Sequence, residues 1–186
     1  SFDMDNAELA YGPKEELSLK KIGLQLDSIY YCGRDIRANV EEFVFKERSG
    51  LELVSTEGRI ASDSVLIQIP KFTMKTTASS LDLQTKIGWD VLEMKKTGVL
   101  SAKINAEIGK GDVAKILGGR DTLFLQTYPN KPFVFRADAE GDLKRLRLRT
   151  LEAGLAKAFE LKAEGDLLYL TDSTRRGGEI NLAALV

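Results

Sequence analysis

Few side chains in this 186-residue chain could carry out acid–base or nucleophilic chemistry, because the sequence contains no histidine. Histidine is the commonest general base, the usual partner of a nucleophilic serine or cysteine, and a frequent ligand of catalytic zinc. The acidic pairs Asp3/Asp5 and Glu41/Glu42 are typical of solvated charges. Cys32 is the single cysteine, and we expect a small packed side chain rather than a reactive thiol. The sequence therefore predicts a non-catalytic protein with no cofactor and no metal site.

The remaining candidates for chemistry are motifs that could bind phosphate. The segment Gly109-Lys110-Gly111 lacks the Lys-Ser or Lys-Thr that ends a phosphate-binding loop. A basic run of Lys144, Arg145, Arg147 and Arg149 alternates with leucines, and we interpret it as the solvated face of a strand, with phosphate binding as the alternative. The 27 basic and 28 acidic residues leave a net charge of −1, which argues against nucleic acid as a partner.

Alternation with a period of two dominates the sequence and predicts antiparallel β-structure. From Leu81 to Val91 the odd-numbered residues are mostly apolar and the even-numbered ones mostly polar, as in a strand with one dry and one solvated side. The segment Leu100 to Ile108 repeats this pattern, and residues 95–98 between the two predict a hairpin turn. Further strands are expected at 17–26, 35–45, 51–55, 65–74, 133–139, 143–151, 159–163 and 180–185. We expect one mainly β segment over residues 1–186.

Two places compete for helix. Residues 112–118 begin with a capping Asp112 and end in glycine, which predicts a short helix. The leucines and phenylalanine at 151, 155 and 159 are spaced by four, but Gly154 and the strand-like flanks favour a strand–turn–strand.

A short internal repeat suggests one recurring unit. Ala139–Leu143 recurs unchanged as Ala163–Leu167, and Thr56–Ile60 is a looser relative. We expect the central glycine of each copy to lie at a turn at the rim of the sheet.

A sheet with one apolar face has to cover that face, and the alternation leaves two solutions open. One is a β-sandwich whose apolar faces meet in a closed core, which the alternation alone favours. The other is a strongly bent sheet whose apolar face lines an open groove. Small residues such as Ala102, Ala106, Ala137 and Ala139 leave room for acyl chains, and they suit close sheet packing equally well.

The chain contains no stretch that approaches the ~20 consecutive apolar residues of a membrane span, and no signal peptide opens it. From these features it is expected to be either cytosolic or an excised segment.

Several stretches follow a family pattern of strands and turns: 26–31, 33–38, 45–53, 128–137, the glycine turns at Gly141 and Gly165, and 155–159. In these stretches the chain resembles the TamB family of AsmA-like bacterial envelope proteins, of the translocation and assembly module type. The resemblance implies a repetitive sheet bent like a taco shell, with an apolar concave face that binds phospholipid acyl chains between the inner and outer membranes. It favours the groove over the sandwich.

The resemblance also implies a periplasmic location, an inner-membrane anchor outside this segment, and an Omp85-type outer-membrane β-barrel partner contacted by other regions. The alternative function is a scaffold that assists outer-membrane protein assembly by adding a β-strand at an open edge. An uncovered groove should make the isolated segment associate with itself. The residues expected to line the groove are Leu81, Leu83, Ile87, Trp89, Val91, Leu100, Ile104, Ile108, Phe133 and Phe135.

Overall fold

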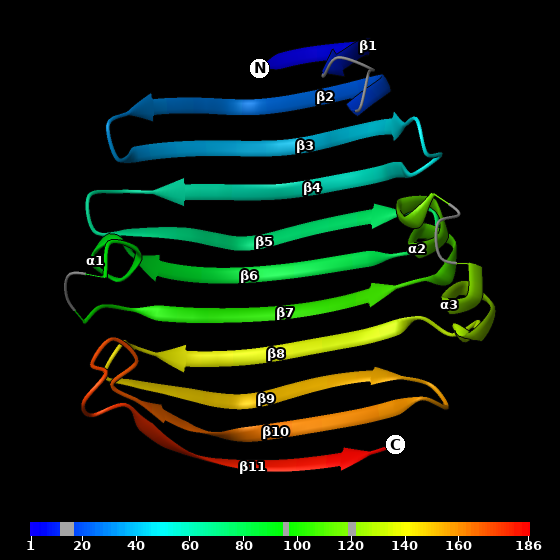
Figure 1. The fold of residues 1–186 in the computed structure, drawn as a ribbon. Coiled ribbons are helices and arrows are strands. Elements are labelled where there is room, and N and C mark those ends of the chain that lie inside the picture. Colours follow the sequence, from blue (N-terminus) through cyan, green and yellow to red (C-terminus); the bar gives the residue numbers. More distant parts are fainter. Residues whose placement is uncertain (12–16, 95–96, 119–121) are drawn as a thin grey trace.

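The chain forms a single antiparallel sheet of eleven strands in a computed structural model that describes residues 1–11, 17–94, 97–118 and 122–186. The strands lie in the sheet in the order in which they occur in the sequence, from β1 at one edge to β11 at the other (Figure 1). The expected mainly β, antiparallel fold is confirmed. All eleven strands belong to one sheet, so the sandwich favoured by alternation alone does not form.

The strands cover most of the described residues and are generally longer than the alternation predicted. They span Phe2–Tyr11 (β1), Leu17–Cys32 (β2), Asp35–Glu47 (β3), Glu52–Ser62 (β4), Leu66–Thr76 (β5), Ser80–Gly88 (β6), Leu100–Ile108 (β7), Phe133–Gly141 (β8), Arg145–Leu155 (β9), Phe159–Leu168 (β10) and Gly177–Leu185 (β11). Each expected strand has a counterpart, and the strand–turn–strand expected at 151–159 is confirmed by β9 and β10. Strand β1 was missed because its alternation changes phase at Asn6, where the pairing with β2 shifts register between Met4 and Ala7.

The repeated glycines do not all lie at turns. Gly141 ends β8, and the Asp142 amide next to it donates a hydrogen bond of 2.9 Å to the Arg145 carbonyl, so this copy of the repeat is a turn. Gly165 lies inside β10 with a φ of +154°, and a Cβ atom there would meet the Glu179 carbonyl oxygen at 2.0 Å. Gly58 lies inside β4. The expectation of turns at Gly165 and Gly58 is therefore wrong: Gly165 permits a close approach of β11.

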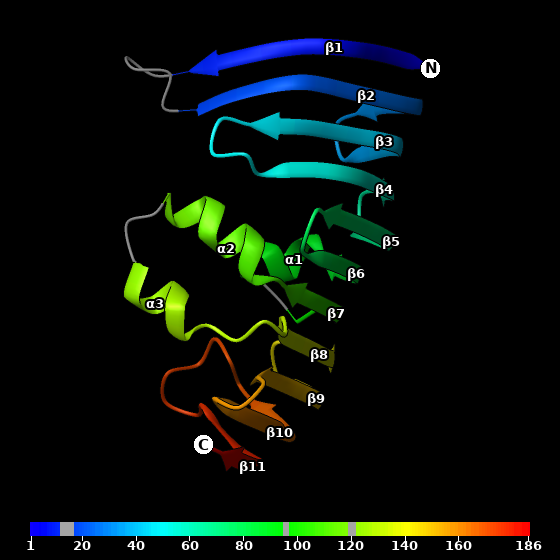
Figure 2. The same ribbon diagram turned by 90° about the vertical axis from the view of Figure 1, so that its right-hand side faces the viewer.

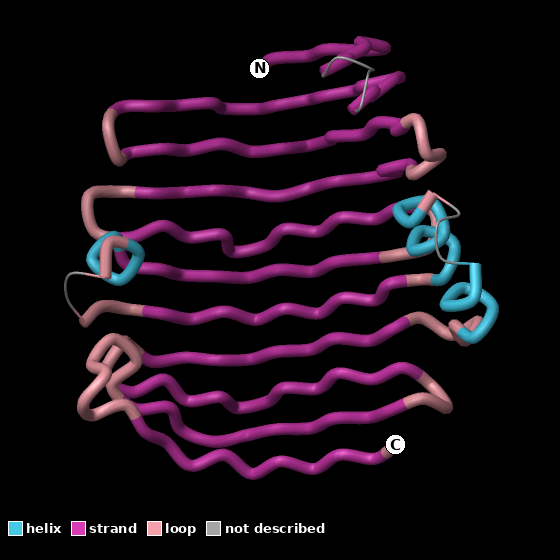
Figure 3. The backbone as a smooth tube through the Cα atoms, viewed as in Figure 1, coloured by secondary structure: helices cyan, strands magenta, loops and turns pink. Residues whose placement is uncertain are grey.

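Three short helices occur among the described residues, and they stand at the ends of the strands (Figures 1 and 3). They span Trp89–Leu92 (α1), Lys110–Leu117 (α2) and Thr122–Thr127 (α3). Helix α2 confirms the helix expected at 112–118, whereas α1 and α3 were not predicted. None of the three has the length and apolar character needed to cross a bilayer. Residues 95–96 of the expected hairpin turn lie outside the described residues.

Helix α1 ends the strand that alternation had extended to Val91. The β6 strand stops at Gly88, and the Trp89 amide donates to the Val65 carbonyl at 3.0 Å. The Trp89 indole N–H donates to the Asp63 carbonyl at 2.7 Å, and the Arg34 guanidinium lies 5.0 Å from the centre of the Trp89 ring. These contacts with the neighbouring hairpins favour a turn of helix over a further strand pair.

Two polar anchors connect the helical segment to the sheet. The Asp112 carboxylate in α2 accepts hydrogen bonds from Thr76, the last residue of β5, and from Thr77 and Ser79 in the turn that follows. Past α3, the buried Tyr128 hydroxyl donates a hydrogen bond of 3.1 Å to the Ile108 carbonyl at the end of β7. The helices are thereby fixed beyond the strand ends.

The sheet is strongly twisted. A quarter turn of the view shows β1–β4 largely along their length and β5–β11 largely end-on, with α2 and α3 beyond the strand ends (Figure 2). The hydrophobic core is correspondingly small. The buried hydrophobic side chains of the described residues are Ile22, Leu53, Val91, Tyr128 and Ala163.

Candidate functional site

The strand register places one apolar row across the whole sheet. Directly paired residues of antiparallel strands project to the same face, so the register traces each face from strand to strand. One unbroken row crosses all eleven strands and contains only apolar residues and glycine. It consists of Phe2, Leu26, Val40, Gly58, Phe72, Leu83, Ile104, Ala137, Leu151, Ala163 and Leu182.

Two further rows flank this central row on the same face. The first contains Met74, Leu81, Ala106, Phe135, Ala153, Leu161 and Ala184. The second contains Ile67, Ile87, Leu100, Gly141, Leu146, Leu167 and Gly178. We call the surface made by these three rows the apolar face.

The opposite surface, the polar face, carries charged and hydrogen-bonding side chains in register. A row next to the central apolar row consists of Glu57, Thr73, Asp82, Asn105, Arg136, Glu152 and Lys162. Arg136 and Glu152 form an ion pair of 3.1 Å across β8 and β9. Alternating polar and apolar rows of this kind give a sheet with one polar and one apolar face.

Three residues of the basic run, Arg145, Arg147 and Arg149, lie in β9 with exposed side chains, and two of them are paired with acids; Lys144 precedes the strand. Arg145 binds Asp166 at 2.9 Å, and Arg149 binds Glu140. The hydrogen bond from Arg145 holds the pKa of Asp166 below its ordinary value. The interpretation of this run as the solvated face of a strand is confirmed.

Eight of the ten residues expected to line a groove lie on the same side of the sheet as the apolar face; six belong to its three rows, and Ile108 and Phe133 form a further pair beside them. In β6, β7 and β8 these are Leu81, Leu83, Ile87, Leu100, Ile104, Ile108, Phe133 and Phe135, and Ile108 pairs directly with Phe133. Trp89 and Val91 do not extend the rows, because they lie in α1. Val91 is buried, whereas the eight strand residues are half-buried or exposed.

Sequence reasoning missed the extent of the apolar face. Leu26, Val40 and Phe72 carry it through β2, β3 and β5, and Leu151 and Leu182 carry it to the edge at β11. Each of these residues lies within a strand that was expected from alternation. The register between the strands was the missing information, and local alternation does not supply it.

The described residues contain no group of three or more acidic or cysteine side chains placed to hold a metal ion. Cys32 is exposed at the end of β2, so the expectation of a packed side chain is wrong. The β2–β3 hairpin turns immediately after it, at Gly33-Arg34, which leaves its side chain at the rim of the sheet.

Comparisons of the chain with protein-family models, with curated proteins and with solved structures find no match. The geometry of the two faces is therefore the basis for a functional proposal.

Proposed function

We propose that the apolar face binds lipid acyl chains, and that this chain is a non-catalytic segment of an envelope protein that conducts phospholipid between the inner and outer membranes. The observation that carries the proposal is the row of apolar residues and glycine that crosses all eleven strands without a polar interruption. An ordinary core would be covered by a second layer, and the side chains of this row are mostly only half-buried.

The apolar face is long enough for an acyl chain to move along it, rather than to be held in a single pocket. Neighbouring strands lie about 4.8 Å apart, so the ten steps from β1 to β11 give a row of about 50 Å. Burial of a lipid tail contributes about 0.8 kcal/mol per methylene group, irrespective of the position of the tail along the row. An acyl chain can therefore move from strand to strand without a specific binding site.

The proposal includes a bend of the sheet that makes the apolar face concave, so that the face forms a groove with the solvated polar face outside. A periplasmic location, an anchor elsewhere in the protein and an Omp85-type partner outside this segment follow from the resemblance to the TamB family. They are part of the same proposal.

A second candidate function is a scaffold that assists outer-membrane protein assembly by strand addition. The observation in its favour is β11, whose nine residues are all exposed and which pairs only with β10. An open edge of this kind presents unpaired amide and carbonyl groups to another extended chain.

Photocrosslinking in living cells distinguishes the two functions. A photoreactive amino acid is placed at Ile104 on the apolar face of the full-length protein, with Lys103, its neighbour on the polar face, as the matched control. Lipid adducts at position 104 and none at position 103 are the expected result. A folded, abundant protein without lipid adducts at position 104 would exclude the lipid path, and protein adducts along β11 would then support the scaffold.

A further inference from the structure

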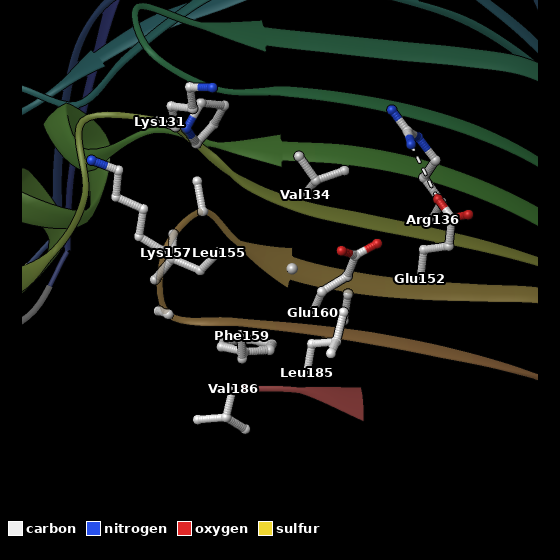
Figure 4. A pocket seen from close by; sticks show the side chains of 15 residues that line it. Lys131, Val134, Arg136, Glu152, Leu155, Lys157, Phe159, Glu160, Leu185 and Val186 are labelled. Atoms are coloured by element: carbon white, nitrogen blue, oxygen red, sulfur yellow. Dashed lines mark hydrogen bonds and ion pairs between the residues drawn. The ribbon is translucent and has the colours of Figure 1, made fainter. Parts of the chain in front are cut away.

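The polar face contains an apolar depression where its charged rows end near the β9–β10 hairpin. One row of this face runs through Val134, Gly154, Glu160 and Leu185, on β8 to β11. Around it lies a cavity of about 620 Å³ (Figure 4). This volume falls within the range of about 300–1,000 Å³ that is typical of small-molecule sites. The central row of the cavity lies on the polar face, and at the β9–β10 hairpin its lining also includes Ala153, Leu155 and Phe159, whose rows belong to the other side of the sheet.

The floor of the depression is open because Gly154 has no side chain. A Cβ atom at this position would meet the nearest atom, the Phe159 carbonyl oxygen, at 3.5 Å, which is an ordinary contact. Neither backbone strain nor crowding therefore requires glycine here, and a larger residue would fill the space. In the row, Val134 lies on one side of this gap and Glu160 on the other, with Leu185 beyond Glu160.

The charges around the depression do not cancel. Arg136 is paired with Glu152 at 3.1 Å on one side, and Glu160 is paired with Lys162 at 2.7 Å. Lys131 and Lys157 lie on the other side, and neither has an ion-pair partner within the described part of the chain (Figure 4). The uncompensated charge at the rim of the cavity is therefore positive.

Lys157 is held in an unusual backbone conformation. Its φ of +64° lies in the left-handed region, where glycine is favoured and most other residues cost about 1 kcal/mol. A Lys157→Gly variant therefore removes the charge from the rim and relaxes the hairpin at the same time.

We propose that this depression binds a single-chain anionic amphiphile with the chemistry of a fatty acid. Its carboxylate lies between the ammonium groups of Lys131 and Lys157, and its alkyl chain covers Val134, Gly154 and Leu185. The site is distinct from the central row of the proposed lipid path, because Val134, Gly154 and Leu185 lie on the polar face.

The test uses a diazirine analogue of decanoate as a photolabel on the purified chain, with mass spectrometry to locate the adducts. Decanoate and 1-decanol, which share a chain length and differ in charge, compete for the label. We expect adducts in the peptide that contains residues 153–160, and decanoate to compete several-fold better than decanol. Because exposed charge pairs contribute up to about 1 kcal/mol, each of Lys131→Gln and Lys157→Gly should weaken decanoate up to about fivefold and leave decanol unchanged.

A second variant tests the cavity itself. Gly154→Leu should abolish the adducts in the 153–160 peptide while adducts around Ile104 on the apolar face persist, with circular dichroism as the check of folding. Equal competition by decanoate and decanol, or unchanged labelling of this peptide in Gly154→Leu, would overturn the proposal. Labelling at 153–160 with none around Ile104 would support this site and count against the lipid path, so that the two proposals can fail separately.

Discussion

The carboxylate of Asp112 in α2 accepts a hydrogen bond of 2.6 Å from the hydroxyl of Ser79, which precedes β6. Thr76 and Thr77 donate to the same carboxylate, and the Lys115 ammonium lies 3.6 Å from it. Asp112 is only 2% exposed. One buried acid therefore connects the helical segment between β7 and β8 to the β5–β6 turn.

Replacement of this acid should destabilise the fold. The Asp112→Asn variant loses the negative charge that the hydroxyl groups and Lys115 bind, and hydrogen bonds to charged groups contribute about 1.5–3 kcal/mol. We expect the free energy of unfolding, measured in urea, to fall by about 2 kcal/mol. Asp82→Asn on the exposed polar face is the matched control and should change stability by less than about 0.5 kcal/mol. Equal stability of the two variants would contradict a structural role for Asp112.

The same carboxylate should contribute to acid sensitivity. Burial raises the pKa of Asp112, but the hydrogen bonds from Ser79, Thr76 and Thr77 and the charge of Lys115 outweigh this and hold the pKa below its ordinary 3.8. Because the pKa of Asp112 is lower in the folded state than in the unfolded state, the ionised carboxylate stabilises the fold at pH values above the unfolded-state pKa. This stabilisation is lost as the pH falls through the folded-state pKa.

The free energy of unfolding of the wild type should therefore decrease below about pH 4, and Asp112→Asn should lose part of that decrease. Thermal unfolding at several pH values between about 2 and 6 measures both slopes. Parallel slopes in the wild type and the variant would show that the Asp112 carboxylate does not titrate differently in the folded state.

The sequence predicted the strands well because period-two alternation is a local property. It predicted the apolar face only in the strands where apolar and polar residues alternate without interruption. The alternation of Ile87, Trp89 and Val91 continues beyond the strand, which ends at Gly88. Contacts of Trp89 with Asp63, Val65 and Arg34, all distant in sequence, favour the turn of helix that follows. Tertiary contacts of this kind override local propensity.

The candidate site depended on information that no local pattern contains. The two repeats around Gly141 and Gly165 are identical in sequence, and their glycines have similar φ angles of +144° and +154°. The chain nevertheless turns directly after Gly141 and continues as a strand beyond Gly165. Both glycines pair on both sides, Gly141 with Leu100 and Leu146 and Gly165 with Leu148 and Ile180. What differs is the length of the strand, because β8 ends at Gly141 and β10 continues to Leu168. The depression at Gly154 likewise arises only when β8 to β11 are in register.

Gly165 provides a sharp test of the observed pairing. A Cβ atom at Gly165 would lie 2.0 Å from the Glu179 carbonyl oxygen, and its φ of +154° is unfavourable for other residues. We expect Gly165→Ala to lower the free energy of unfolding by about 2 kcal/mol and to increase amide exchange along β11. Gly154→Ala is the control, because its nearest contact is an ordinary 3.5 Å. Similar stability in both variants would contradict the close approach of β10 and β11.

Thr56 offers a substitution that should stabilise the fold. Its side chain is 4% exposed, and its hydroxyl oxygen is buried without a hydrogen-bond partner among the described residues. Because a buried unsatisfied hydroxyl is costly, the isosteric Thr56→Val should raise the free energy of unfolding by about 1 kcal/mol. Thr56→Ser keeps the hydroxyl and loses the methyl group, so it should lower stability. A loss of stability in Thr56→Val would indicate that the hydroxyl is satisfied in solution.

The uncovered apolar face should make the chain associate with itself or bind detergent. Soluble monomers rarely expose apolar patches larger than a few hundred Å², and the face here extends across eleven strands. We expect sedimentation velocity to detect association that a non-ionic detergent reverses. Ile104→Gln interrupts the central row and should weaken the association several-fold, whereas Lys103→Gln on the polar face should leave it unchanged. A wild-type chain that sediments as a monomer and binds no detergent would show that the apolar face is covered in solution, and the lipid path would then lose its physical basis.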